Sequence, residues 1–148
     1  MYAGTSTGTM NDAIGERMLE DVEEDLVAET QDTAPIAVGA ATVIEVGGLR
    51  VDVVIYSPVK VDPSDRITVE NVRRCTRATL VAACARELDS LVLPAIYPST
   101  EDMSMAEAAR AMIDELRGFR TDHEFTVYLV HDDMKVIDAL TRIIETVR

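Results

Sequence analysis

Short, almost entirely apolar segments alternate with longer amphipathic ones along this chain, and that alternation limits the folds it can adopt. The apolar segments are Val51 to Tyr56, Leu91 to Ile96 and Phe125 to Val130. Each has the length and composition of a strand that is buried on both faces of a sheet. Because strands that alternate with helices build right-handed βαβ units, the sequence predicts a three-layer α/β/α fold with a mainly parallel central sheet.

Apolar residues at helical spacing predict the helices that accompany these strands. The first, over residues 10–26, repeats an apolar residue every fourth position. Residues 68–88 predict a second helix, a third ends at Gly118, and a fourth closes the chain. In the second helix the expected inward-facing residues are Val72, Cys75, Thr76, Thr79, Leu80 and Ala83. In the third they are Met105, Ala108, Ala109, Met112, Ile113 and Leu116. In the fourth they are Ile137, Leu140, Ile144 and Val147, with Val136 and Ile143 beside them.

Glycine marks two further features. The pair Gly47-Gly48 separates a Val- and Ile-rich stretch, residues 36–46, from the first apolar strand, and it predicts a tight hairpin turn. Residues 1–9 are small and polar with two glycines, which is typical of a loop or a flexible arm. Since no internal repeat interrupts the chain, residues 1–148 are expected to form a single domain.

The charge balance excludes several classes of partner. The chain has 27 acidic and 14 basic residues, for a formal net charge of -13. This excess repels nucleic acid phosphates and anionic lipids, so binding to nucleic acid or membranes is not expected. No apolar run approaches the roughly 20 residues that a membrane span needs, and no secretory signal follows Met1, so a cytoplasmic location is expected.

The cysteine and histidine positions predict no metal site, and the arginine positions allow two interpretations. Cys75 and Cys84 lie too far apart along the predicted helix to bond each other and are expected to be core thiols. With only two histidines and no CxxC motif, no metal site is predicted. The basic residues of this helix, Arg73, Arg74 and Arg77, suit an anion site or a solvated face that pairs with acids such as Glu70, and the ion-pair interpretation is favoured.

Three stretches of this chain, in order, are VDVVIYSPV, ITVENVRRCTRATLVAACARELDSLVLPAI and MAEAARAMIDELRGF. Together they resemble the macrodomain family, whose members bind ADP-ribose or related nucleotides. Asn71 matches the asparagine of the family's helix, Pro94 lies near the end of the next strand, and Glu107 to Arg110 match an EAAR segment. Residues 7–15, TGTMNDAIG, resemble the family's glycine-rich loop and the helix after it, so the resemblance covers nearly the whole chain.

The resemblance implies a nucleotide cleft at the carboxyl ends of the strands. The ligand-binding positions that it implies are Gly8, Thr9, Met10, Ser57, Tyr97, Pro98, Ser99, Thr100 and His131.

Two departures from the family pattern bear on this cleft. The family's first strands, with an adenine-reading Asp and an NAAN-like segment, precede the point at which this chain starts. Its GTGxxG phosphate loop is replaced here by Tyr97 to Asp102, which contains no glycine. Pro98 has no N-H to offer a phosphate, and Glu101 and Asp102 add like charge, so the pocket is expected to be degraded.

Acid-base chemistry has several candidates, but none forms a recognisable catalytic set. The candidates are Asp12, Glu101, Asp102, His131, Asp132 and Asp133. The acids ahead of the helices are better explained as caps or as partners of the helix dipole. His131 either stacks on a nucleotide base, as an aromatic does in the family, or is a solvated residue at a strand end. No catalytic residue is therefore assigned.

These observations favour one function and leave alternatives. The favoured function is an interaction or assembly scaffold with a degraded ADP-ribose cleft, and the alternative is an ADP-ribose or related nucleotide-binding module. Enzymatic activity is not expected, and an active form would be an ADP-ribose-linked hydrolase. No cofactor is expected beyond ADP-ribose as a ligand. An unpaired sheet edge predicts a homo-oligomer or a larger protein partner, unless the hairpin around Gly47-Gly48 covers that edge and leaves a monomer.

Overall fold

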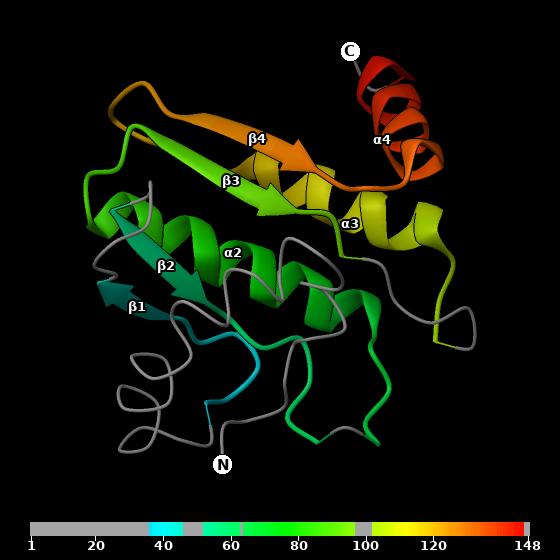
Figure 1. Ribbon diagram of the computed structural model, residues 1–148, viewed down its shortest axis with the longest axis horizontal. Helices are drawn as coiled ribbons and strands as arrows, with labels where there is room; N and C mark the ends of the chain where they lie inside the picture. Colours follow the sequence, from blue (N-terminus) through cyan, green and yellow to red (C-terminus); the bar gives the residue numbers. More distant parts are fainter. Residues whose placement is uncertain (1–35, 46–51, 63, 97–101, 147–148) are drawn as a thin grey trace.

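The computed structural model describes residues 36–45, 52–62, 64–96 and 102–146, and its elements follow the predicted order (Figure 1). They are β1 (Thr42–Glu45), β2 (Val53–Tyr56), α2 (Val69–Ala85), β3 (Ser90–Pro94), α3 (Met105–Gly118), β4 (Thr126–Val130) and α4 (Met134–Thr146). The three predicted apolar strands are confirmed as β2, β3 and β4, with shifted ends. The arm at residues 1–9, the predicted helix at 10–26 and the turn at Gly47-Gly48 lie outside the described residues.

Strand pairing among the described residues is mixed. β1 pairs with β2 antiparallel, from Thr42 opposite Tyr56 to Glu45 opposite Val53, as a hairpin requires. β3 pairs with β4 parallel, and Val92 lies opposite Tyr128. The parallel pair is joined through α3, which is the crossover that the alternation of strands and helices predicted.

Local signals set the ends of α2. The hydroxyl of Thr68 accepts a hydrogen bond from the backbone N-H of Asn71 at 3.2 Å and so caps the start of the helix. At the other end Glu87 adopts a left-handed conformation, with φ of 54°, and the N-H of Leu88 donates to the carbonyl of Ala83 at 3.2 Å. This pattern satisfies carbonyls that the last turn of a helix leaves unpaired.

The predicted inward face of α2 is confirmed residue by residue: Val72, Cys75, Thr76, Thr79, Leu80 and Ala83 are all buried. Each of the two buried threonines donates a hydrogen bond from its hydroxyl to a backbone carbonyl of the same helix: Thr76 to Val72 at 2.8 Å and Thr79 to Cys75 at 3.0 Å. No polar hydrogen on this face is therefore left without an acceptor. Cys75 and Cys84 are free thiols. Cys75 is buried in the core, as expected, and burial raises its pKa, whereas Cys84 is only partly buried because it lies off the inward face of α2.

The core lies between β3, α2 and α3. Its largest group of buried residues is Val59, Ile67, Val72, Cys75, Leu93, Ile96, Met103, Ala108, Ala111 and Met112. In Figure 1, α2 and α3 lie behind the strands and α4 packs beside α3. None of the helices in the described ranges is long and apolar enough to cross a membrane.

The buried face of α4 differs in part from the prediction. Val136 and Leu140 are buried, whereas Ile144, expected on the inner side, is 36% exposed. Ala95, Ala109 and Ile113 form the surface on which α4 packs, so the helix is held mainly through its first half. The periodicity of α4 is compatible with either of two neighbouring stripes, and contact with α3 selects the one that contains Val136.

A histidine joins the turn after α2 to the loop before β4. His123 Nε2 lies 3.2 Å from the carbonyl oxygen of Leu88, and Nδ1 lies 3.3 Å from Asp122 Oδ1. The Leu88 carbonyl first, then the carboxylates of Asp122 and Asp89, raise the pKa of His123. The protonated ring is therefore the form that this contact favours.

Candidate functional site

Three strands end at the same side of the described structure. The arrows of β2, β3 and β4 run in the same direction in Figure 1, so the residues that follow them gather at one end. Ser57 follows β2, Ala95 and Ile96 follow β3, and His131 follows β4. In α/β sheets, loops at the carboxyl ends of strands form the ligand sites, so this is the end at which the predicted cleft belongs.

Ser57 is held by its own neighbours. Its hydroxyl donates to the carbonyl of Ala40 at 2.8 Å, and the Cys75 thiol donates to the Ser57 carbonyl at 3.1 Å. These bonds tie the end of β2 to the segment before β1 and to α2. With its hydrogen committed to Ala40, the Ser57 hydroxyl is left to act toward a ligand as a hydrogen-bond acceptor.

Asn71, which matches the asparagine of the family's helix, holds the loop after β2 through a hydrogen bond. Its side-chain Nδ2 donates to the carbonyl of Val59 at 3.0 Å. Val59 is 2% exposed, and Pro58 beside it is also fully buried. Asn71 was not among the predicted ligand positions, and the structure gives it the role of positioning Pro58 and Val59.

The start of α3 is closed by a reciprocal cap between Ser104 and Glu107. The Glu107 backbone N-H donates to the Ser104 hydroxyl at 3.2 Å, and the Ser104 backbone N-H donates to Glu107 Oε2 at 2.9 Å. The Ser104 hydroxyl also donates to that oxygen at 2.7 Å. These bonds lower the pKa of Glu107, so a carboxylate occupies the positive end of the helix.

This cap was readable in the sequence but was not used for the site prediction. A serine followed three residues later by glutamate, ahead of an apolar helical stripe, is the signature of a capping box. The segment that leads to it begins outside the described residues, and with it Tyr97, Pro98, Ser99, Thr100 and Glu101. Gly8, Thr9, Met10 and Asp12 lie outside them as well. Their predicted roles stay predictions.

His131 closes β4 and is more buried than a solvated strand-end residue. Its side chain is 18% exposed, which corrects that interpretation. Nδ1 accepts the backbone N-H of Asp133 at 2.9 Å, and Asp132 Oδ1 lies 3.1 Å from the same nitrogen. The ring is thus oriented by its own turn.

Asp133 acts as a helix cap, as the sequence suggested for acids at helix starts. Its Oδ1 accepts the backbone N-H of Lys135 at 2.8 Å, and its carbonyl accepts the N-H of Val136 at 3.0 Å. Within the part of the chain that the structure describes, no group of three or more His, Cys, Asp or Glu side chains is placed to hold a metal ion.

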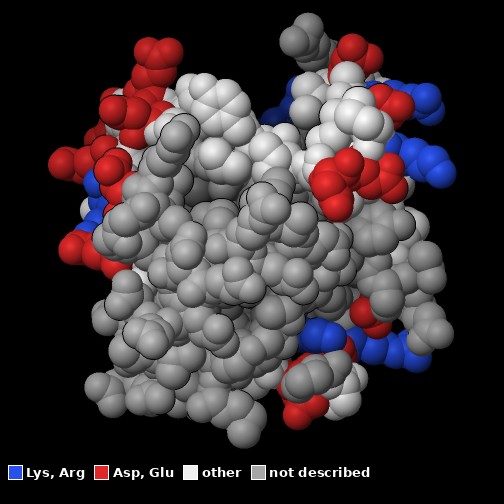
Figure 2. Space-filling model, viewed as in Figure 1, with Lys and Arg blue, Asp and Glu red and all other residues white. Residues whose placement is uncertain are grey.

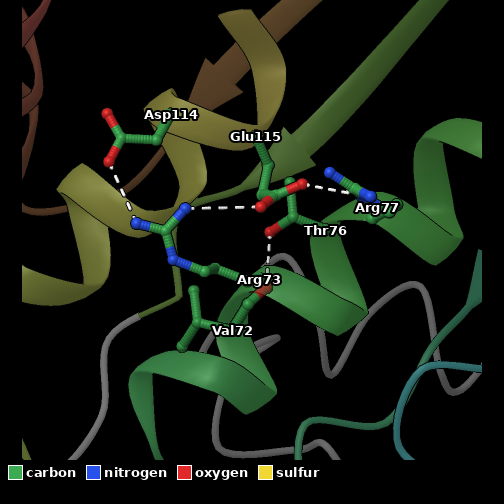
Figure 3. A network of polar contacts seen from close by, with 6 residues as sticks. All are labelled: Val72, Arg73, Thr76, Arg77, Asp114 and Glu115. Carbon is green, nitrogen blue, oxygen red and sulfur yellow. Dashed lines mark hydrogen bonds and ion pairs between the residues drawn. The ribbon is translucent and has the colours of Figure 1, made fainter. Parts of the chain in front are cut away.

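Two arginines of α2, Arg73 and Arg77, form ion pairs (Figure 3). Arg73 contacts Asp114 at 3.1 Å and Glu115 at 3.3 Å, and Arg77 contacts Glu115 at 2.8 Å. The hydrogen bond to Asp114, and then that to Glu115, raise the pKa of Arg73. The predicted ion-pair role is confirmed for these two arginines, with partners on α3 in place of Glu70.

Comparisons with known proteins agree with this geometry. A family model described as the Macro domain matches residues 3–112. A protein of Aquifex aeolicus is 30% identical over 121 residues, which covers 82% of this chain and 73% of that protein. A protein of Aeropyrum pernix is 32% identical over 82 residues, which covers 55% of this chain and 43% of that one.

Solved structures of low sequence identity share the fold. A variant of the Oceanobacillus iheyensis macrodomain with ADPR matches with a TM-score of 0.73 at 13% identity, over 99% of this chain and 84% of that one. The same macrodomain with ADP matches at a TM-score of 0.71 and 14% identity, over 99% and 83%. The macrodomain of Thermus aquaticus DarG matches at 0.66 and 13%, over 86% and 85%.

Proposed function

We propose, from the premise that this chain belongs to the macrodomain family, that it acts as an interaction or assembly scaffold whose nucleotide cleft binds ADP-ribose weakly or not at all. The family supplies the α/β fold and the general role of a module that binds ADP-ribose. The weakened cleft and the scaffold role are proposed for this chain, and they rest on its departure from the family's phosphate loop and on the side chains around the cleft.

The glycine-free, acidic sequence from Tyr97 to Asp102 carries the proposal, and the capping box at the start of α3 supports it. A diphosphate held at a helix start needs free backbone N-H groups and the positive end of the helix dipole. Here the carboxylate of Glu107 already occupies that end and takes the N-H of Ser104. Bringing a phosphate to the same place sets two negative charges against each other, which costs on the order of 1 kcal/mol even when solvent screens them.

The other described positions of the cleft are also engaged within the protein. Ser57 donates its hydroxyl hydrogen to Ala40, and His131 Nδ1 accepts the N-H of Asp133. A ligand would have to use what remains of their hydrogen-bonding capacity. This arrangement supports a cleft that is kept for the fold and is poorly suited to a nucleotide.

A binding module remains the second candidate, and the comparisons favour it. The Oceanobacillus iheyensis structures are titled with ADPR and with ADP, so that relative holds such ligands in the shared fold. For this chain to bind such ligands, side chains after β2 and β4 must supply contacts that make up for the repulsion between a phosphate and the acidic residues at the start of α3. Ser57 and His131 are the described side chains positioned to do so.

Calorimetric titration with ADP-ribose separates the two candidates. We expect the unmodified protein to bind with a Kd above about 100 µM. The substitution Glu107→Gln keeps the size of the side chain and removes its charge, so we expect about a threefold to tenfold gain in affinity. Glu145→Gln makes the same charge change on an exposed position of α4 and serves as the matched control. Low-micromolar binding by the unmodified protein would establish the binding module and exclude the weakened cleft.

A further inference from the structure

The loop that joins α3 to β4, residues 119–125, has few attachments to the rest of the described structure. None of its side chains is fully buried. Arg120 donates to the carbonyl of Arg117 at 2.7 Å, and Thr121 donates to the carbonyl of His123, so both bonds stay within the loop and the end of α3. Within the described ranges, His123 is the side chain of this loop that hydrogen-bonds to a distant part of the chain, the turn after α2.

Both nitrogens of the His123 ring face oxygen acceptors. Nε2 lies 3.2 Å from the carbonyl oxygen of Leu88, and Nδ1 lies 3.3 Å from Asp122 Oδ1. The ring of Phe125 meets the imidazole edge-on, with the ring centroids 6.2 Å apart. A neutral imidazole has one N-H and can satisfy only one of the two oxygens, whereas an imidazolium ion has a donor on each nitrogen. The geometry therefore fits the doubly protonated ring.

The charges around the ring favour the same form. Figure 2 shows acidic side chains gathered at the upper left, over the loop that leads into β4 and the turn after α2. The exposed acids of these two segments are Glu87, Asp89, Asp122 and Glu124. Arg86, in the same turn, is paired with Glu45 on β1 at 3.1 Å. Acidic surroundings of this kind stabilise a cation on His123.

The same groups set the pH range in which the ring titrates. The Leu88 carbonyl first, and then Asp122 and Asp89, raise the pKa of His123 from its ordinary value of 6.5. Cys84, on the last turn of α2, is a neutral thiol in this range because burial, and then Asp122, raise its pKa. Of these groups, the ring is the one that changes charge as the pH rises above 6.5.

We propose that His123 is a proton-operated latch, which holds residues 119–125 against the turn after α2 while its ring is doubly protonated and lets this loop open when the ring becomes neutral. In either neutral tautomer, one ring nitrogen presents a lone pair to the oxygen of Leu88 or Asp122, and that contact becomes repulsive. The Thr126 N-H donates to the Asp89 carbonyl at 3.0 Å, so the pairing of β3 and β4 begins directly after the loop and involves no atom of the ring. The opening is therefore local.

The loop also carries apolar side chains that the latch keeps from water. Phe119 and Phe125 line a cavity of about 340 Å³ together with residues of α2, α3, β4 and α4, among them Leu80 and Leu116. Both phenyl rings are partly buried in the closed arrangement. Opening of the loop moves them toward solvent, so the pH controls how much apolar surface this end of the molecule presents.

Trypsin reads the state of the loop, because Arg120 is a cleavage site within it. The rate of cleavage after Arg120 is measured from about pH 6 to about pH 8.5 and is divided by the rate for a synthetic peptide of residues 118–125, which removes the pH dependence of trypsin itself. We expect this ratio to rise about tenfold across the titration of His123, since cleavage of a loop follows the population of its open form.

Cleavage within the helices distinguishes opening of the loop from opening of the whole fold. Cuts after Arg77 in α2 and Arg110 in α3 are expected to stay at least about tenfold slower than the cut after Arg120 at every pH. Equal cleavage at the three sites would mean that the loop opens only with the fold, and a ratio that does not change with pH would mean that no proton operates it. Either result would overturn the proposal.

Matched variants identify the proton, with each variant compared with a peptide of its own sequence and the His123 ring followed by NMR. His123→Gln is expected to give the high-pH ratio at every pH. Asp122→Asn removes the charge that faces Nδ1 and is expected to move both the ring titration and the cleavage transition to lower pH. Asp138→Asn, the same change at an exposed position of α4, should move neither.

A pH dependence that persists in His123→Gln, or a cleavage transition that does not follow the ring titration in Asp122→Asn, refutes the latch. If His123→Gln fails to fold, the comparison of Asp122→Asn with Asp138→Asn still decides the matter. Titration with ADP-ribose tests the cleft separately, because the latch lies at the amino ends of β3 and β4.

Discussion

Replacing Glu115 with glutamine tests whether the polar contacts between α2 and α3 stabilise the fold. Glu115 is the shared acceptor of Arg73 and Arg77, and its side chain is only 11% exposed, so its charge is partly withdrawn from water. The substitution preserves shape and one acceptor oxygen but removes the charge that both guanidinium groups contact. Arg73 keeps its contact with Asp114, so the loss is partial.

The two contacts differ in their expected contributions. Arg73 is 35% exposed and, facing a mostly buried carboxylate, is expected to contribute about 1 kcal/mol. Arg77 is 68% exposed and is therefore discounted to about 0.5 kcal/mol. Glu115→Gln is thus expected to lower the free energy of unfolding by about 1 to 2 kcal/mol.

Urea denaturation followed by circular dichroism measures this difference. The midpoint should fall without a change in the slope, because the surface exposed on unfolding stays the same. Glu145→Gln, which makes the same charge change at an exposed position of α4, should remain within about 0.5 kcal/mol of the unmodified protein. At about 1 M salt the Arg77 part should shrink most, since its charge is the more exposed of the two. Equal effects of Glu115→Gln and Glu145→Gln would refute the assigned role of the network.

Two further predictions concern single residues. Gly39 has φ of 94°, and a Cβ there would lie 2.8 Å from Arg74 Nε, so Gly39→Ala should destabilise the protein by about 1 kcal/mol in a thermal melting experiment. Gly118 has no neighbouring atom within 4 Å of such a Cβ, so Gly118→Ala should be neutral or stabilising in the same experiment. The raised pKa of His123 means that its contribution to stability is fully present below about pH 6.5 and is lost as the pH rises through the higher folded-state pKa. His123→Gln should therefore lower the melting temperature at pH 5.5 more than at pH 9, and an equal loss at both would contradict the proton-linked contact.

Much of the fold was determined by the sequence because its signals are local. The spacing of apolar residues identified the buried face of α2 from Val72 to Ala83, and the apolar segments identified three strands. These features follow from the periods of helix and strand, which any short stretch of chain displays. The family was also readable from the order of segments, including the asparagine at Asn71.

The tertiary structure alone decided which surfaces meet. Periodicity shows that a residue faces inward or outward, but not what it will contact, because the partner comes from a distant part of the chain. Hence Arg73 pairs with Asp114 and Glu115 on α3 instead of Glu70 on its own helix, and His131 is more buried than a strand end suggested. The orientation of each strand pair likewise depends on packing, since the same apolar strand satisfies a parallel or an antiparallel position equally well.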